Sequence, residues 1–191
     1  MMLRLVPLDC PACGSAMRGE PWDTLFLCPH CGSGGILGED GLEIIESTAL
    51  LPVPGRRADL WRPAWILEAD VTVAARLLAD GTPTQGSGTR RRFVLPAFDL
   101  PLATFTRLAA ALTAVAEATG EVPHAPVTGG VLSTEDALVF ARHLVLSEEI
   151  GRPDVLGSIR VEVAPVAWRL AATPFERAGD RFRCAVTGTP L

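Results

Sequence analysis

The chain has 191 residues, a formal net charge of −5 and a hydrophobic content of 48%. This length accommodates one ordinary domain and a small module, and the hydrophobic content suffices for a packed core, which excludes general disorder. No apolar run reaches the length of a membrane-spanning helix, and residues 1–7 lack the pattern of a signal peptide. We therefore expect a cytoplasmic protein without a membrane span.

Two Cys-x-x-Cys turns stand near the N-terminus. The first reads Cys10-Pro-Ala-Cys13-Gly and the second, after fourteen intervening residues, reads Cys28-Pro-His-Cys31-Gly. In each turn the Pro fixes φ, and the Gly allows the backbone to turn back with a positive φ. Four thiolates at this spacing can close a tetrahedral shell around zinc. We predict one zinc ion per chain, held by Cys10, Cys13, Cys28 and Cys31.

Iron binding, two disulfides and a redox motif are the alternatives to zinc for these cysteines, and iron binding is the strongest of them. Iron also accepts four thiolates, so a rubredoxin-like electron carrier stays an alternative. Two disulfides would need an oxidising compartment, and a thioredoxin-like redox motif uses one Cys-x-x-Cys rather than a matched pair. We expect His30, between two ligands, to be an exposed loop residue, and Cys184 to be a buried residue of a C-terminal strand.

Residues 8–46 resemble a zinc ribbon with rubredoxin-type CPxCG knuckles. The resemblance implies a three-stranded sheet stapled by metal, with short strands at residues 24–27 and 42–45. It implies no single function, because such ribbons serve in transcription, translation, enzymes and assembly factors. The wider layout, with a Trp-Arg-Pro-Ala-Trp segment and a Val-Leu-Pro-Ala-Phe segment after the ribbon, resembles uncharacterised bacterial zinc-ribbon proteins.

A linker is predicted at residues 47–60, because the Leu-Pro-Val-Pro-Gly stretch at residues 51–55 disfavours both helix and central strand. We therefore divide the chain into a zinc ribbon, residues 1–50, and an α+β domain, residues 51–191, with antiparallel strands and two helices. Trp22 is expected to pack on the ribbon core rather than to contact a partner. Trp61 and Trp65 could anchor a partner, since tryptophan is enriched at interfaces, but they are expected instead to bury the ribbon against the second domain.

Strands are predicted on both sides of the helical part. Residues 65–73 alternate apolar and polar side chains, which indicates a half-buried strand, and residues 93–95 are expected to pair back on it. On its polar face, Glu68 and Asp70 are expected to be solvated rather than catalytic. Further strands are predicted at residues 159–163, 166–172 and 181–186.

Two helices are predicted between these strands. Residues 102–118 carry apolar side chains at helical spacing, and Gly120 is expected to end that helix. Ser133 is expected to cap a second helix, whose first turn contains Glu135 and Asp136. His124, in the loop at residues 119–132, has no second ligand at useful spacing and is expected to be structural or at the surface.

Three consecutive bases, Arg90, Arg91 and Arg92, end the Gly-rich loop predicted at residues 79–90. They could contact an anion or a partner, or be solvated, since Arg is the only strong base in a chain without Lys, Asn or Tyr. That inventory indicates a GC-rich, bacterial genome. Residues 1–50 carry two arginines and seven acids, and an acidic ribbon is a poor partner for a phosphate backbone.

The sequence contains no catalytic constellation that we recognise, so we expect no enzyme. We predict a structural zinc-binding protein that acts as a protein–protein interaction or assembly module within a larger complex. A zinc-ribbon protein that binds nucleic acid through Arg90, Arg91 and Arg92 is the first alternative, and iron-based electron transfer is a less favoured one.

Overall fold

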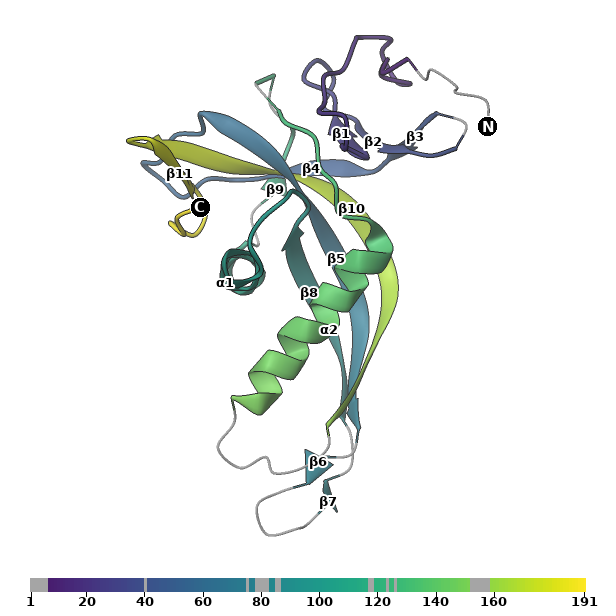
Figure 1. The fold of residues 1–191 in the computed structure, drawn as a ribbon, viewed down its shortest axis with the longest axis vertical. Coiled ribbons are helices and arrows are strands. Elements are labelled where there is room, and N and C mark those ends of the chain that lie inside the picture. The colour runs from purple at the N-terminus through teal and green to yellow at the C-terminus, as the bar shows by residue number, and fades with distance from the viewer. Residues whose placement is uncertain are drawn as a thin grey trace.

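The computed structural model describes residues 7–39, 41–74, 76–77, 83–84, 87–116, 119–122, 124–125, 127–151 and 159–191. A small sheet near the N-terminus sits at one end of a larger, strongly curved sheet, and two helices pack against the larger sheet (Figure 1). This mixed arrangement of antiparallel strands and two helices confirms the predicted α+β class. Neither helix in the described part of the chain is long and apolar enough to cross a membrane.

The small sheet has three antiparallel strands in the order β1-β2-β3, namely β1 (Leu25–Leu27), β2 (Gly34–Leu37) and β3 (Leu42–Ile45). The strands predicted at residues 24–27 and 42–45 are confirmed. The middle strand, β2, lies in the Gly-rich stretch between Gly32 and Gly41, and its glycines are the reason that the sequence pattern did not predict a strand there. Close approach explains one of them, since a Cβ on Gly34 would lie 2.9 Å from Ile45 Cγ2.

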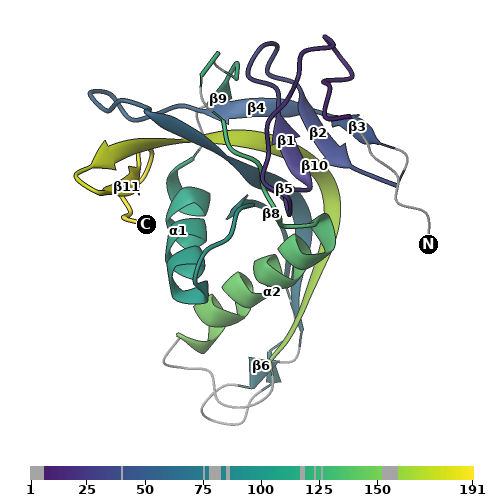
Figure 2. The ribbon, with the colours of Figure 1, turned by 45° about the horizontal axis from the view of Figure 1, so that its top comes forward.

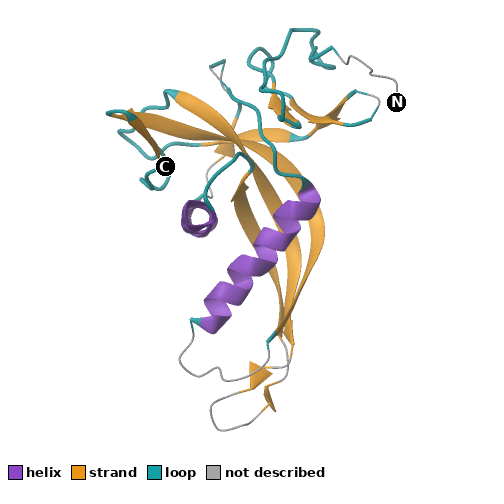
Figure 3. Cartoon of the chain, in the orientation of Figure 1, coloured by secondary structure: helices purple, strands orange, loops and turns teal. Residues whose placement is uncertain are grey.

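The large sheet has the order β8-β5-β10-β4-β9, and β11 pairs with β10 at residues 175–178, after the stretch that pairs with β4. Figure 3 shows the strands in orange and the two helices in purple. Its centre is the antiparallel ladder between β5 and β10, which runs the length of β5. The strands are β4 (Ser47–Leu50), β5 (Leu60–Ala74), β8 (Ser87–Pro96), β9 (Thr119–Gly120), β10 (Arg160–Ala178) and β11 (Arg181–Cys184), and a separate pair consists of β6 (Arg76–Leu77) and β7 (Pro83–Thr84).

Several strands run further than the sequence pattern predicts. The predicted strand at residues 65–73 lies within β5, and residues 93–95 pair back on it as part of β8. The two strands predicted at residues 159–163 and 166–172 are one strand, β10, whose register shifts between Pro165 and Ala167. Pro165 therefore causes a bulge rather than a break, because one irregular position accommodates a residue that cannot donate a ladder hydrogen bond.

Strand β4 crosses between the two predicted halves of the chain. It lies inside residues 1–50, yet it pairs in parallel with β10 through Ser47, Thr48 and Ala49. The last residues assigned to the ribbon thus belong to the large sheet. The division into two domains at residue 50 stays a prediction, and the two parts share one hydrogen-bonded sheet.

Two hydrophobic cores lie on the two faces of β5, as a period of two requires. Trp65 and Leu67 point toward α2 (Thr134–Ile150), whereas Ile66 points toward α1 (Leu102–Val115). The edge strand β8 lies against both helices (Figure 2). Phe105 of α1 and Phe140 of α2 place their ring centroids 4.2 Å apart, so the two helices are in contact within the first core.

The helix boundaries confirm one prediction and correct another. Ser133 caps α2, since its Oγ accepts a hydrogen bond of 3.1 Å from the backbone N–H of Asp136. Helix α1 ends at Val115, where Ala116 leaves helical geometry at φ −82° and ψ 62°, and residues 117 and 118 lie outside the described residues. The predicted role of Gly120 as the helix stop is wrong, because Gly120 is part of β9.

The ribbon is joined to the large sheet by backbone hydrogen bonds and by apolar packing. Gly130 O accepts from Thr24 N at 2.7 Å and from Leu25 N at 2.9 Å, and Gly130 N donates to Leu25 O at 2.9 Å. Leu25 is also in the same core cluster as Trp61 and Trp65, which confirms that both tryptophans bury the ribbon against the rest of the chain. Trp22 is 82% exposed, so its predicted packing on the ribbon core is wrong.

Trp65 is the side chain whose removal tests this packing most directly. It is fully buried, its Nε1 donates to Leu132 O at 2.7 Å, and its ring meets Trp168 edge-on at a centroid distance of 5.5 Å. We expect Trp65→Ala to lower the free energy of unfolding by about 3–5 kcal/mol, as for other large core truncations. Urea denaturation measures this, with the exposed Val139→Ala in α2 as the control; equal midpoints for the two variants would contradict the packing described.

Candidate metal centre

The two Cys-x-x-Cys turns have the same backbone construction. In the first, Gly14 N donates to Cys10 O at 2.8 Å, and in the second, Gly32 N donates to Cys28 O at 2.9 Å. Both glycines have a positive φ, 71° and 76°, as the sequence pattern predicts. The two knuckles therefore present their sulfur atoms in the same way, and the β-hairpin geometry around them brings the two turns face to face.

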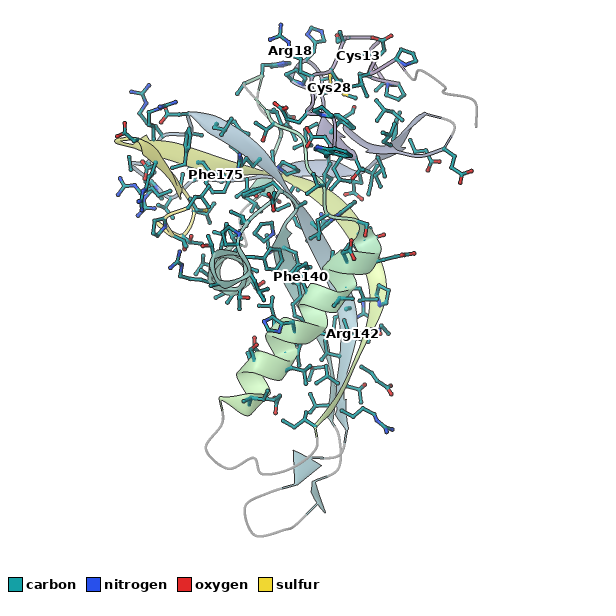
Figure 4. The ribbon with its side chains drawn as sticks, viewed as in Figure 1. Cys13, Arg18, Cys28, Phe140, Arg142 and Phe175 are labelled. Carbon is teal, nitrogen blue, oxygen red and sulfur yellow. The ribbon has the colours of Figure 1, made fainter. Side chains whose placement is uncertain are left out.

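The four sulfur atoms form one compact cluster (Figure 4). All of them lie within 4.8 Å of one another; Cys10 Sγ is 3.6 Å from Cys31 Sγ, and Cys13 Sγ is 3.7 Å from Cys28 Sγ. A tetrahedral zinc ion with Zn–S bonds of about 2.3 Å requires sulfur separations of about 3.8 Å. These distances are too long for disulfide bonds, which are about 2.05 Å. The donor set therefore fits a single tetrahedral metal ion.

Burial and hydrogen bonding divide the four thiols into two pairs. Cys10 and Cys28 are buried, whereas Cys13 and Cys31 are exposed. Burial raises the pKa of Cys10 to about 12 and also raises the pKa of Cys28, against the opposing effect of backbone N–H groups that face each sulfur. Each knuckle thus contributes one buried and one exposed sulfur.

Two serines, which the cysteine spacing alone does not predict as part of the site, stabilise the thiolate forms of Cys13 and Cys31. Hydrogen bonds from the Ser15 side chain and backbone lower the pKa of Cys13, and those from Ser33 lower the pKa of Cys31 to about 6. Ser33 Oγ lies 3.2 Å from Cys31 Sγ. The signal for both serines is present in the chain, since each knuckle continues as Cys-Gly-Ser. A metal ion that binds here needs thiolate ligands, and two of the four sulfurs are already biased toward that form.

The second knuckle is bonded to the large sheet, whereas the bonds of the first knuckle that involve described residues stay within the ribbon. Ser47 Oγ of β4 donates to Gly32 O at 2.7 Å and accepts from Gly34 N at 3.0 Å. A Cβ on Gly32 would lie 2.9 Å from Val122 Cβ, so the glycine also permits close contact between the second knuckle and Val122. In the first knuckle, the cross-links from Cys10 are to Ser15 O and to the sulfur cluster itself.

The other residues that the sequence analysis singled out are not among the four possible ligands. His30 is exposed, as predicted, and His124 sits at the surface with its Nδ1 3.3 Å from Pro29 O, where it contacts the second knuckle. Cys184 is a buried residue of β11, also as predicted. Glu68 and Asp70 face arginines, at 3.6 Å from Arg169 and 2.6 Å from Arg90.

Arg90, Arg91 and Arg92 lie in β8 and not at the end of a loop, which corrects the predicted position. Alternation along the strand sends them to different neighbours. Arg90 forms a two-pronged hydrogen bond with Asp70, and Arg91 forms one with Glu148 of α2. Arg92 donates to Ala116 O at the end of α1. The three side chains thus tie β8 to its surroundings and do not share one face.

No family model, curated protein or solved structure matches this chain. The function is therefore argued from the cysteine cluster and the surfaces around it.

The split between buried and exposed sulfurs predicts an order of chemical modification. In the metal-loaded protein at pH 7, we expect N-ethylmaleimide to label Cys13 and Cys31 at least about tenfold faster than Cys10 and Cys28, because reactivity follows thiolate character and access. Peptide mass spectrometry over a time course measures the four rates. Cys184 is the internal control and should be labelled last; earlier labelling of Cys10 or Cys28 would contradict the geometry.

Proposed function

We propose that the chain binds one zinc ion through Cys10, Cys13, Cys28 and Cys31, and that this ion has a structural role. The observation that carries the proposal is the cluster of four sulfurs at tetrahedral separations. Four protein ligands leave no open position for a substrate, which is the arrangement of structural rather than catalytic zinc. When bound, the ion supplies a cross-link between the two knuckles.

We further propose that the protein is a protein–protein interaction or assembly module and not an enzyme. Trp22 supports this, because it is 82% exposed on the ribbon while Trp61 and Trp65 are buried. Tryptophan is enriched among the residues that dominate binding energy at interfaces. An exposed tryptophan next to a rigid, metal-stapled turn is the kind of preformed anchor that a partner surface can cover.

Nucleic-acid binding receives little support from the charged residues. The three arginines of β8 point to separate neighbours, and two of them are paired with carboxylates. A binding face for phosphates needs a continuous stripe of bases. Iron fits the same four sulfurs as zinc does, so the metal analysis below decides between a structural ion and a one-electron carrier.

The metal proposal predicts a linked loss of ion and structure. We expect Cys28→Ser to lose the zinc ion and to unfold the ribbon, because structural zinc binding and folding are coupled. Elemental analysis gives the metal identity and stoichiometry, and limited proteolysis should cut residues 7–45 of the variant at least about tenfold faster. Cys184→Ala, which removes a thiol outside the cluster, is the control. A wild-type ribbon that stays fully folded without metal would contradict the proposal.

The module proposal predicts a complex that depends on Trp22. When the zinc-loaded chain is isolated from its own cells under native conditions, we expect a mass well above the 20.2 kDa of one chain. Trp22→Ala should dissociate that complex without loss of zinc, because the side chain is exposed and no core depends on it. Val139→Ala, at an exposed position in α2, should leave the complex intact. A monomer of 20.2 kDa in the wild type would contradict the module proposal.

A further inference from the structure

A continuous groove runs between the ribbon and the loop that precedes α2. It consists of three hollows of about 760, 470 and 300 Å³. The first and second share Arg18 and Val127, the second and third share residues that include Glu20 and Gly129, and the first and third share none. The hollows therefore lie in a row. We call this row the seam groove, with residues 15–20 as its ribbon wall and residues 124–125 and 127–129 as its other wall.

The two ends of the seam groove carry opposite charge. The titratable residues that line the first hollow are all basic, namely Arg18, His30 and His124. Arg18 makes no ion pair or hydrogen bond with any residue that the structure describes, and Figure 4 shows it at the end of the molecule that also carries the labelled Cys13. This end of the groove offers an unneutralised guanidinium in a region where residues 1–50 are otherwise strongly acidic.

The third hollow, at the opposite end, is acidic and contains the exposed tryptophan. Three carboxylates, Glu20, Asp23 and Asp99, outnumber its one base, Arg62. The Arg62 guanidinium lies 4.4 Å from the centre of the Phe98 ring, and the Asp23 charge acts on it. Arg62 is thus held within the protein, and the carboxylates of Glu20 and Asp99 are in excess. Trp22 lines the same hollow.

We propose that the seam groove binds an extended peptide segment of the partner protein, with an acidic residue at Arg18 and a basic residue at the Glu20 and Trp22 end. This inference rests on the proposed module function and names the surface that would carry it. Three hollows in a row suit an extended chain better than a compact molecule. Val127, which lines both the first and the middle hollow, supplies apolar contact between the charged ends, and Leu27 adds apolar surface to the first hollow. Charge complementarity of this kind fixes the direction and register of a bound chain.

The cysteine cluster holds one wall of the seam groove in place. The ribbon wall follows Cys13 directly in the sequence, and the first knuckle reaches the rest of the chain through the sulfur cluster and a small core that includes Met17 and Phe26. The other wall is fixed to β5, since Thr128 N donates to Trp61 O at 3.1 Å. Metal binding therefore controls the width of the groove, and peptide binding should require the metal-loaded protein.

The test uses two fluorescein-labelled hexapeptides with the same apolar centre. One is acetyl-Glu-Glu-Leu-Val-Lys-Lys-amide, and the other has glutamine at all four charged positions. We expect the charged peptide to bind the zinc-loaded full chain at least about tenfold more tightly in fluorescence anisotropy, because two opposite-charge contacts are lost in the neutral peptide. Arg18→Ala should weaken binding of the charged peptide about fivefold, whereas Arg142→Ala, on the exposed face of α2, should not.

Either of two results would overturn the seam groove as a binding site: equal affinity for the two peptides, or equal affinity of the Arg18→Ala and Arg142→Ala variants. Both variants keep the cysteine cluster, so a folding defect does not obscure the outcome. If the peptides fail while Trp22→Ala still dissociates the native complex, this inference is wrong and the module proposal stands. If the charged peptide binds a chain that is monomeric in its own cells, the groove stands and the module proposal is wrong.

Discussion

The antiparallel ladder between β5 and β10 is the constraint on which the rest of the structure depends. Its alternation sends Trp65 and Leu67 to one face and Ile66 to the other, so one strand supplies both hydrophobic cores. The same two strands also contribute to the packing of the ribbon, since Trp61 of β5 and Leu170 of β10 are in the same core cluster as Leu25 of β1. The ribbon is therefore not an appendage on a linker. It sits on the end of the ladder that organises the helices.

The cysteine cluster connects the second knuckle, which is bonded to the large sheet, to the first knuckle, which has fewer attachments among the described residues. The second knuckle is bound to β4 through Ser47 and touches the loop at Val122. The first knuckle has no comparable attachment among the residues that the structure describes, apart from the ribbon itself. A metal ion shared by the two knuckles would transmit the position of the large sheet to residues 10–20. This makes the metal a determinant of surface shape near Trp22, in addition to a stabiliser of a small fold.

The sequence predicted those parts of the fold in which local pattern and tertiary environment agree. The cysteine spacing located the cluster, strict alternation located β5, and Ser133 located the start of α2. The incorrect predictions have a common cause: each depends on tertiary contacts with residues that are distant in the sequence. The sequence did not predict β2 because glycine is usually depleted in strands, whereas Gly34 is needed in this strand for its close contact with Ile45. The residues around Trp22 do not predict its exposure, because exposure depends on which other elements cover it. The sequence alone suggested one basic patch at Arg90–Arg92, whereas the structure pairs two of these arginines with different carboxylates.

The register shift in β10 at Pro165 has a consequence for solubility. Residues 160–169 of β10 pair with β5 on one side, whereas β4 and β11 begin to pair on the other side only from Leu170 onward, within the described part of the chain. That leaves a long open edge, which could pair with a second chain and start aggregation. The irregularity between Pro165 and Ala167 breaks the flat line of donors and acceptors along this strand. The bulge thus lets the protein keep an open strand edge without presenting a template for uncontrolled self-association.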